Sequence, residues 1–316
     1  MNYLNSINNP KAELHIHLEG SLEPQMILDL AKRNNIQIKY SSLAEFAKAY
    51  QFKNLQEFLD LYYLGMSVLK TENDYFDLTY AYLTRAHQDN VTHSEMFFDP
   101  QAHLERGVSL DIMMSGLWRA IVQAKVDYGI NGSLIPCFLR HLSEGNALSV
   151  FDDLMNYRDK IIGIGLDSSE LGNPPAKFKN LFNLARKEQL KLLAHAGEEG
   201  PVSYVWDALD ILGVDRIDHG NAILSDQALI KRIATDKITL TMCPLSNRCL
   251  QVVPDLSKHQ AIELLNHDVC VTINSDDPAY FGGYINQNYI ELATALNLTD
   301  AEINKLIENS LTAKFV

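Results

Sequence analysis

Residues 12–18 read AELHIHL, a short apolar run with two histidines, His15 and His17, near its end. Seven more short runs of apolar or β-branched residues follow, separated by longer stretches with helical spacing: 91–98 (VTHSEMFF), 133–139 (SLIPCFL), 161–166 (IIGIGL), 191–196 (KLLAHA), 216–219 (RIDH), 238–243 (ITLTMC) and 269–274 (VCVTIN). Strands that alternate with helices predict a parallel sheet with right-handed crossovers. Such a sheet either closes into a (β/α)8 TIM barrel or stays open as a doubly wound sheet.

Polar side chains at the ends of the predicted strands favour the barrel. His15 and His17 close the first run, His195 lies at the end of the fifth, and Asp276 follows the eighth. Barrel enzymes place their chemistry at the carboxyl ends of the strands. Because residues two apart in a strand face the same side, His15 and His17 can bind one ion. His195 and Asp276 can complete the cluster, and three imidazoles with one carboxylate suit Zn²⁺ that also carries a reactive water.

Three further polar residues at strand ends can supply the remaining chemistry. Glu198 comes shortly after the fifth run, where a protonated acid in a dry pocket can act as a proton donor. His219 can orient an attacking water or accept its proton. Asp277 can contact a ring nitrogen of the substrate. Plainer interpretations are an acidic loop, a turn with a capping aspartate, and an Asx turn before a proline.

The sequence offers no bridging ligand for a second metal ion. The fourth run is followed by 167–170 (DSSE), and the lysine near this run, Lys160, lies at its opposite end. We therefore predict one zinc ion per chain. The other histidines lack neighbouring ligand types and are interpreted as structural or surface residues: His87, His93, His103, His141, His259 and His267.

A long gap separates the first two predicted strands. It contains helical patterns over 24–34, 42–50, 55–69 and 74–90, which we interpret as an insertion over about 22–90 that roofs the active site. Within 74–88, the spacing of Phe76, Tyr80, Leu83 and His87 predicts a buried helical stripe. No Pro/Gly/Ser-rich linker interrupts the chain, so residues 1–316 are predicted to form one domain.

Composition limits the classes of partner. Of 316 residues, 27 are Lys or Arg and 40 are Asp or Glu, which gives a net charge of −13. This surplus argues against binding a nucleic-acid polymer or an anionic membrane, and it favours a small-molecule substrate. The four cysteines form no CxxC pair, the N-terminal residues show no apolar signal segment, and no apolar run approaches membrane-spanning length. We therefore expect a cytoplasmic protein. A homo-oligomer is compatible with the sequence, but nothing in the sequence shows one.

Six segments stand in the order and spacing of one known family: HIHLEGSLEP (15–24), GIGLDSSELGNPP (163–175), LLAHAGEEGP (192–201), RIDHG (216–220), TMCPLSN (241–247) and TINSDDPAYFGGY (272–284). From about residue 11 to its end, the chain resembles the adenosine/adenine deaminase family of metal-dependent barrel hydrolases. The resemblance is closest to the adenine deaminase branch. In adenosine-type enzymes the first motif usually carries an aspartate that meets the ribose, whereas Glu19 here is one methylene longer and can fill that space. The segment around Ser168 also resembles the adenine branch.

The resemblance implies roles for individual residues. His15, His17, His195 and Asp276 become zinc ligands, Glu198 the proton donor to the purine ring, and His219 the residue that positions the attacking water. Asp277, Glu19 and Ser168 become substrate-binding residues. The implied reaction is hydrolytic deamination of adenine to hypoxanthine and ammonia, in purine salvage. The alternatives are a deaminase of adenosine, of an N6-substituted adenine or of an aminofutalosine-like nucleoside, another barrel hydrolase, and a non-catalytic purine-binding protein.

Overall fold

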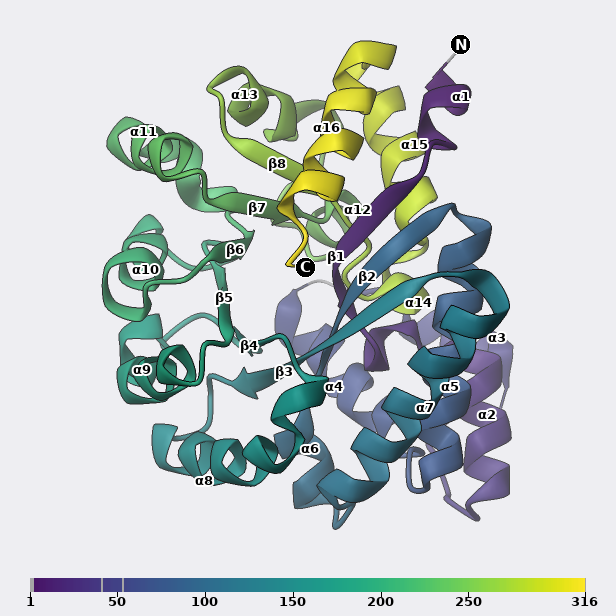
Figure 1. Cartoon of the computed structure of the whole chain (residues 1–316). Helices are drawn as coiled ribbons and strands as arrows, with labels where there is room; N and C mark the ends of the chain where they lie inside the picture. The colour runs from purple at the N-terminus through teal and green to yellow at the C-terminus, as the bar shows by residue number, and fades with distance from the viewer. Residues whose placement is uncertain (1–2, 41, 53, 316) are drawn as a thin grey trace.

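Eight parallel strands form the centre of the computed structural model, which describes residues 3–40, 42–52 and 54–315. Positions 1–2, 41, 53 and 316 belong to the predicted domain but lie outside the described residues. The strands pair in chain order, with helices arranged around them (Figure 1). The strand bounds are β1 (Lys11–His17), β2 (Val91–Phe98), β3 (Asn131–Leu139), β4 (Gly163–Asp167), β5 (Lys191–Ala196), β6 (Arg216–His219), β7 (Thr239–Met242) and β8 (Cys270–Ile273). The predicted (β/α)8 barrel is confirmed, and the open sheet is excluded.

The barrel closes between β1 and the end of β8. The backbone N–H of His17 donates to the carbonyl of Asp276 at 2.9 Å, and the N–H of Asp276 donates to the carbonyl of His15 at 3.1 Å. Below this bridge, the Asn274 side chain accepts a hydrogen bond from the N–H of Leu14 at 2.9 Å. Closure therefore brings the aspartate that follows β8 directly against the two histidines of β1.

Several of the helices that follow β2 to β8 have a capping side chain or a proline at their first turn. The helices after these strands are α6 (Pro100–Glu105), α7 (Leu110–Tyr128), α8 (Glu144–Leu154), α9 (Lys179–Lys187), α10 (Val202–Asp207), α11 (Gln227–Asp236), α12 (Pro244–Cys249), α13 (Ala261–Asn266), α14 (Pro278–Phe281), α15 (Ile285–Leu296) and α16 (Asp300–Ala313). The Ser109 side chain caps α7, which stops at Gly129 with a φ of 72°. Thr299 and Glu302 form a capping box at α16.

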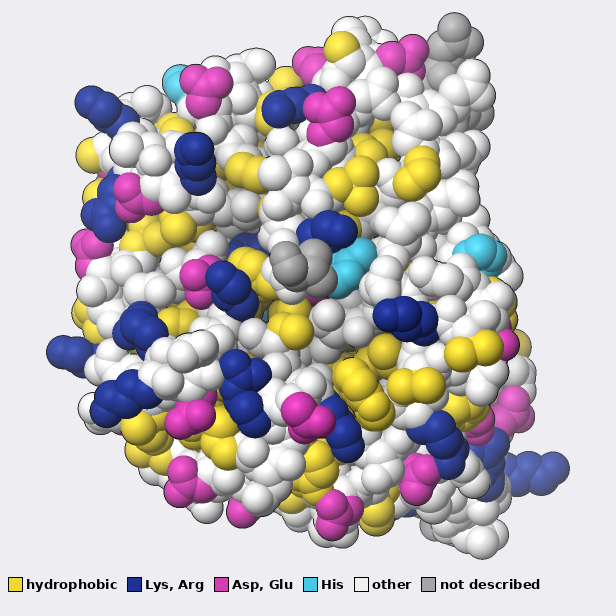
Figure 2. Space-filling view, in the orientation of Figure 1, with side chains coloured by type: hydrophobic (Ala, Val, Ile, Leu, Met, Phe, Trp, Pro, Cys, Tyr) yellow, Lys and Arg dark blue, Asp and Glu magenta, His cyan; other side chains and the backbone are white. Residues whose placement is uncertain are grey.

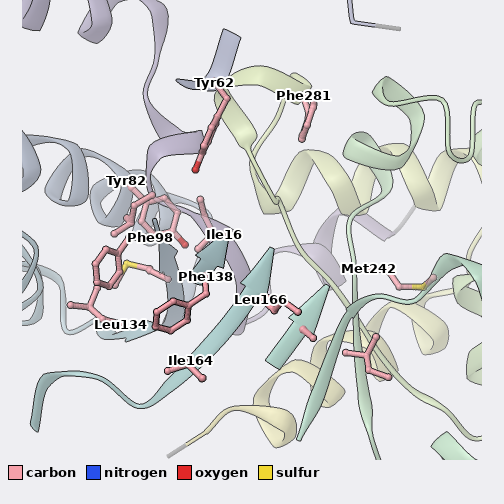
Figure 3. Close-up of a cluster of buried hydrophobic side chains, with 14 of the residues drawn as sticks. Ile16, Tyr62, Tyr82, Phe98, Leu134, Phe138, Ile164, Leu166, Met242 and Phe281 are labelled. Atoms are coloured by element: carbon pink, nitrogen blue, oxygen red, sulfur yellow. The ribbon is translucent and has the colours of Figure 1, made fainter. Parts of the chain in front are cut away.

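In the described residues between β1 and β2, the α-helices are α2 (Pro24–Arg33), α3 (Leu43–Ala49), α4 (Leu55–Met66) and α5 (Glu72–Gln88). A short helix, α1 (Tyr3–Ile7), precedes β1. Helix α4 contacts α14, the helix that follows β8, since the ring centroids of Phe58 and Phe281 are 4.7 Å apart. Figure 3 shows Tyr62 of α4 and Phe281 beyond the ends of the strands, away from the core side chains Leu134 and Phe138. The segment after β1 thus places an apolar cover over the carboxyl ends of the strands.

The predicted buried stripe of α5 is wrong for three of its four residues. Leu83 is buried, but Phe76 and Tyr80 are only partly buried and His87 is exposed. The buried face lies about one residue earlier along the helix and includes Tyr75, Leu78, Tyr82 and Ala86. The Tyr82 hydroxyl donates to Glu13 at 2.7 Å, so this tyrosine turns toward the barrel. Phe76 and Tyr80 instead stack on each other along the flank of α5. Aromatic spacing alone did not distinguish these two faces.

The outside of the molecule mixes charges of both signs. On the face shown in Figure 2, Lys and Arg side chains are interspersed with Asp and Glu. In the described part of the chain, no helix combines the length and apolarity needed to cross a bilayer.

Candidate active site

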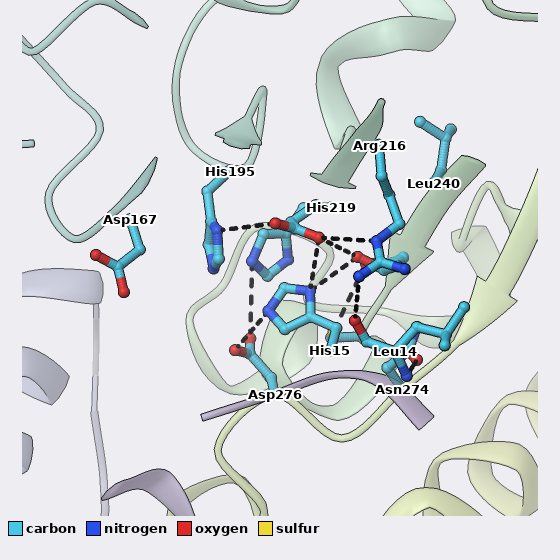
Figure 4. Close-up of polar contacts among 12 residues, drawn as sticks. Leu14, His15, Asp167, His195, Arg216, His219, Leu240, Asn274 and Asp276 are labelled. Atoms are coloured by element: carbon cyan, nitrogen blue, oxygen red, sulfur yellow. Dashed lines mark hydrogen bonds and ion pairs between the residues drawn. The ribbon is translucent and has the colours of Figure 1, made fainter. Parts of the chain in front are cut away.

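The four predicted metal ligands meet at the carboxyl ends of the strands. His15 and His17 come from β1, His195 from β5, and Asp276 from the turn after β8. Asp276 Oδ1 lies 3.2 Å from His15 Nε2 and 3.5 Å from His17 Nε2, and the Nε2 atoms of His17 and His195 are 3.2 Å apart. All four side chains are at least nine-tenths buried. Figure 4 shows His15, His195 and Asp276 turned toward one another.

Each of the three imidazoles directs its other nitrogen at an oxygen. The Thr241 hydroxyl donates to Asp218 at 2.8 Å, so it accepts from His15 Nδ1, which lies 2.9 Å away. His195 Nδ1 is 3.4 Å from Asp218 Oδ2, and His17 Nδ1 is 3.6 Å from a carboxylate oxygen of Asp167. The hydrogen bond to Thr241 fixes the tautomer of His15 and leaves its Nε2 lone pair free for a metal ion, whereas the carboxylates lie close to Nδ1 of His195 and His17 without forming a hydrogen bond.

The carboxylate of Asp218 lies close to the guanidinium of Arg216. Arg216 lies fully buried on the same strand, donates to the carbonyl of Leu14 at 3.1 Å and pairs with Glu95 at 2.6 Å. Burial opposes the charge of Asp218, but the close contact with His195 and the nearby cations hold its pKa below the usual value. The sequence suggested only a capping turn at this aspartate. Its inward direction depends on the strand register, which composition does not reveal.

Three residues at the site have a left-handed backbone. The φ angles of Ser168, His219 and Asp276 are 73°, 66° and 63°. Each stands at the end of its strand or just after it, at β4, β6 and β8. Non-glycine residues in this region are uncommon and tend to mark functional turns. The kink turns each side chain away from its strand direction, and nothing in the sequence indicated it.

Glu198, His219 and Asp277 lie next to the ligand cluster. His219 Nε2 is 3.7 Å from Glu198 Oε2 and 3.8 Å from Asp276 Oδ2. Burial raises the pKa of Glu198 well above its ordinary value, and the charge of Asp276 adds to this rise. Burial also lowers the pKa of His219 well below its usual value. Asp277 packs against Gly20 so closely that an added Cβ there would meet its carboxylate at 1.9 Å. Burial therefore favours the uncharged forms of both the Glu198 carboxyl and the His219 imidazole.

A pocket of about 400 Å³ joins these groups to the cover formed by α4. Its floor is polar and its roof is apolar or aromatic, the usual composition of a small-molecule site. The lining residues are His17, Leu55, Phe58, Leu59, Tyr62, Tyr63, Asp99, Asp167, Ser168, His195, Glu198, His219, Leu250, Asp276, Asp277 and Phe281.

Two predicted substrate-binding residues have different surroundings. The Ser168 hydroxyl lines the pocket and lies 3.2 Å from the Tyr63 hydroxyl. Glu19 lies behind the lining, where one carboxylate oxygen accepts from His103 at 2.8 Å and from the N–H of Asp99 at 2.9 Å. His103 was interpreted as structural or surface, and it is fully buried beside this predicted site residue. The sequence does not predict that Asp99 and Asp167 line the pocket, because isolated acidic residues in a sequence give no sign that they share one pocket.

Comparison with known proteins assigns the chain to a family. The model of the adenosine deaminase family matches residues 10–316. The chain belongs to the adenosine deaminase family. Adenine deaminase of Zymomonas mobilis is 54% identical over 307 residues, which are 97% of this chain and 91% of that protein. Adenine deaminase of Acinetobacter baylyi is 52% identical over 97% of this chain and 92% of its own length.

Two solved structures agree with the fold. The crystal structure of adenine deaminase from Arthrobacter aurescens has a TM-score of 0.95 and 46% identity, and covers 97% of this chain and 94% of its own. An amidohydrolase from Burkholderia ambifaria with bound Zn has a TM-score of 0.90 and 27% identity, and covers 99% and 88%.

The described residues fit a metal ion in chemistry as well as in position. His15, His195, His219 and Asp276 offer ligand atoms that all lie within 4.8 Å of one another, and His17 groups with Asp276 in a second set. Within the described residues, the Nδ1 atoms of His195 and His219 both lack a hydrogen-bond partner, although His195 Nδ1 lies 3.4 Å from Asp218 Oδ2. The assignment of His17 as a ligand, with His219 beside the centre, stays a prediction.

Proposed function

We propose that this protein catalyses zinc-dependent hydrolytic deamination of adenine to hypoxanthine and ammonia. The observation that carries the proposal is the pairing of buried Glu198 with His219 beside a cluster of three imidazoles and a carboxylate. Relatives more than half identical over nearly the whole chain are named adenine deaminase, which supports this substrate. The setting that we predict for the reaction is purine salvage in the cytoplasm.

In this proposal His15, His17, His195 and Asp276 hold one zinc ion. Zinc in such a site lowers the pKa of water and supplies a hydroxide nucleophile near neutral pH. The related amidohydrolase with bound Zn supports the choice of metal.

Residues of this chain supply the proton steps and the orientation of the base. The neutral imidazole of His219 orients the attacking water toward carbon 6 of adenine and accepts a proton from it. Glu198 donates its proton to the neighbouring ring nitrogen as the water oxygen adds to carbon 6. The bond between carbon 6 and the amino nitrogen then breaks. Ammonia leaves with the proton that His219 took from the water, and the proton of the added hydroxyl returns to Glu198 as the carbonyl of hypoxanthine forms. Asp277, beside Asp276, contacts a nitrogen of the five-membered ring. The apolar roof of α4 excludes water from the base.

The preference for a free base is supported by side chains that meet at one wall of the pocket. Ser168 hydrogen-bonds with Tyr63 at 3.2 Å and with His141 at 2.9 Å, which links α4 to the loops after β3 and β4. Glu19 lies outside the pocket lining and is only 2% exposed. We expect a ribose on adenine to compete for space with these side chains.

The test is ammonia release from a panel of 6-aminopurines by the purified, zinc-loaded protein. We expect adenine to be the best substrate, ahead of adenosine and N6-substituted adenines. A preference for adenosine would contradict the substrate assignment, and two metal ions per chain would contradict the single-zinc mechanism.

A further inference from the structure

Glu170 makes an unusual set of hydrogen bonds with the loop that carries Glu198. It follows β4, is 1% exposed and does not line the pocket. One carboxylate oxygen accepts from the backbone N–H of Gly197 at 2.6 Å. The other oxygen accepts from the N–H groups of Glu198, Glu199 and Gly200 at 2.9, 3.0 and 2.8 Å. The backbone N–H groups of four consecutive residues, 197–200, therefore all donate hydrogen bonds to one side chain.

This arrangement fixes the loop strongly. An ionised carboxylate offers about four lone-pair sites, and hydrogen bonds to a charged acceptor are roughly twice as strong as neutral ones. The backbone approaches so closely that a Cβ on Gly200 would lie 2.5 Å from Cδ of Glu170. Gly197 has a φ of 70°, which lets the chain turn around the carboxylate.

Arg140 connects the same carboxylate to the end of β5. Its guanidinium is fully buried, donates to the carbonyl of His195 at 2.6 Å and lies 3.9 Å from Glu170. The segment from the histidine of β5 to Gly200 is thus held at its start by Arg140 and along its turn by Glu170. Glu198 sits in the middle of this segment, with its carboxyl 3.7 Å from His219.

We propose that Glu170 is a positioning residue for the reaction, which fixes the backbone of residues 197–200 and thereby aims Glu198 at the substrate. This inference rests on the proposed function for its catalytic part. Glu170 does not touch the pocket, so it acts through Glu198. Its negative charge also contributes to the raised pKa of Glu198, after burial and the charge of Asp276. This charge therefore favours the protonated form of the donor.

The test compares three variants of the full-length protein. Glu170→Gln keeps the shape but replaces an acceptor oxygen with an N–H₂ group that faces backbone donors. Glu170→Asp keeps the charge on a shorter side chain. Glu199→Gln is the control, because it removes a charge from the same loop, while the four bonds to Glu170 use only backbone N–H groups.

For Glu170→Gln we expect kcat on adenine to fall about 100-fold with little change in KM, because a small misplacement of a reacting group has an effect of that order. On the alkaline side of its pH profile, kcat of Glu170→Gln should begin to decline at a lower pH than kcat of the parent. Glu170→Asp should keep the parental alkaline decline and recover part of kcat, and Glu199→Gln should match the parent in kcat. Backbone amides 197–200 should exchange with deuterium faster in Glu170→Gln than in the parent.

A folded Glu170→Gln protein with parental kcat and parental amide exchange would overturn the proposal, as would an equal loss of kcat in Glu199→Gln. If Glu170→Gln does not fold, Glu170→Asp carries the same comparison of kcat and exchange. If the parent itself releases no ammonia from any 6-aminopurine, the proposed function fails. The exchange measurement still decides whether Glu170 fixes the loop.

Discussion

Replacing Glu198 by glutamine tests the proton donor with the smallest structural change. Glu198 is 7% exposed, and burial raises the pKa of its carboxyl well above the ordinary value. The raised pKa favours the protonated, uncharged form of Glu198, and glutamine reproduces the shape and the lack of charge of that form. Glu198→Gln adds no buried charge and leaves no large cavity, so folding and binding of the base should be preserved. What glutamine cannot do is give up a proton.

A positioned general acid contributes about 10²- to 10⁴-fold to rate, which corresponds to roughly 3–5 kcal/mol of barrier. We expect kcat on adenine to fall by this factor, with KM close to that of the parent. In the parent, kcat should decline as pH rises through the raised pKa of Glu198, because the donor loses its proton. The assay is ammonia release over a range of pH, with zinc content and thermal unfolding as controls. A folded, zinc-loaded Glu198→Gln protein with kcat within tenfold of the parent would refute the reasoning.

Three further predictions concern the metal and the size of the pocket. The His17→Ala protein should lose zinc, whereas the His219→Ala protein should keep zinc and have a lower kcat. Metal analysis of both proteins tests this prediction. The reverse result would make His219 the ligand and leave His17 beside the metal. Chelation should lower thermal stability and zinc should restore it, because a ligand at 100 times its Kd stabilises by about 2.7 kcal/mol; an unfolding midpoint that zinc does not move would count against a native site. Glu19→Asp should raise kcat/KM for adenosine relative to adenine, since it shortens the side chain behind the pocket wall; an unchanged ratio of the two kcat/KM values would remove Glu19 from the determinants of substrate size.

The barrel was predictable because its signals are local and repeated. Short apolar runs between helical stretches located all eight strands, and the bounds of β2, β5 and β6 agree with the predicted runs. The rule that barrel chemistry lies at strand ends also predicts that His15, His195 and Asp276 lie together. The structure places them within hydrogen-bonding distance or near it. Their roles as ligands remain predictions.

The features that the sequence did not reveal depend on direction rather than on residue type. Asp218 and Asp167 lie close to histidine side chains only because their strands present them inward. The turn at Asp276 requires a left-handed backbone, which an Asp-Asp-Pro segment does not predict. Glu170 lies in a motif noted for its resemblance alone, and its four backbone partners are 27 to 30 residues away. Such contacts are set by the packing of β4 against β5 and have no local signature.

The most direct test of the central claim is kcat/KM for adenine and for adenosine, measured on the purified protein with one zinc ion bound per chain. The account predicts stoichiometric release of ammonia and hypoxanthine from adenine, with kcat/KM well above that for adenosine. It also predicts loss of this activity on chelation and its return with zinc. Adenosine as the better substrate, or full activity in metal-free protein, would contradict it.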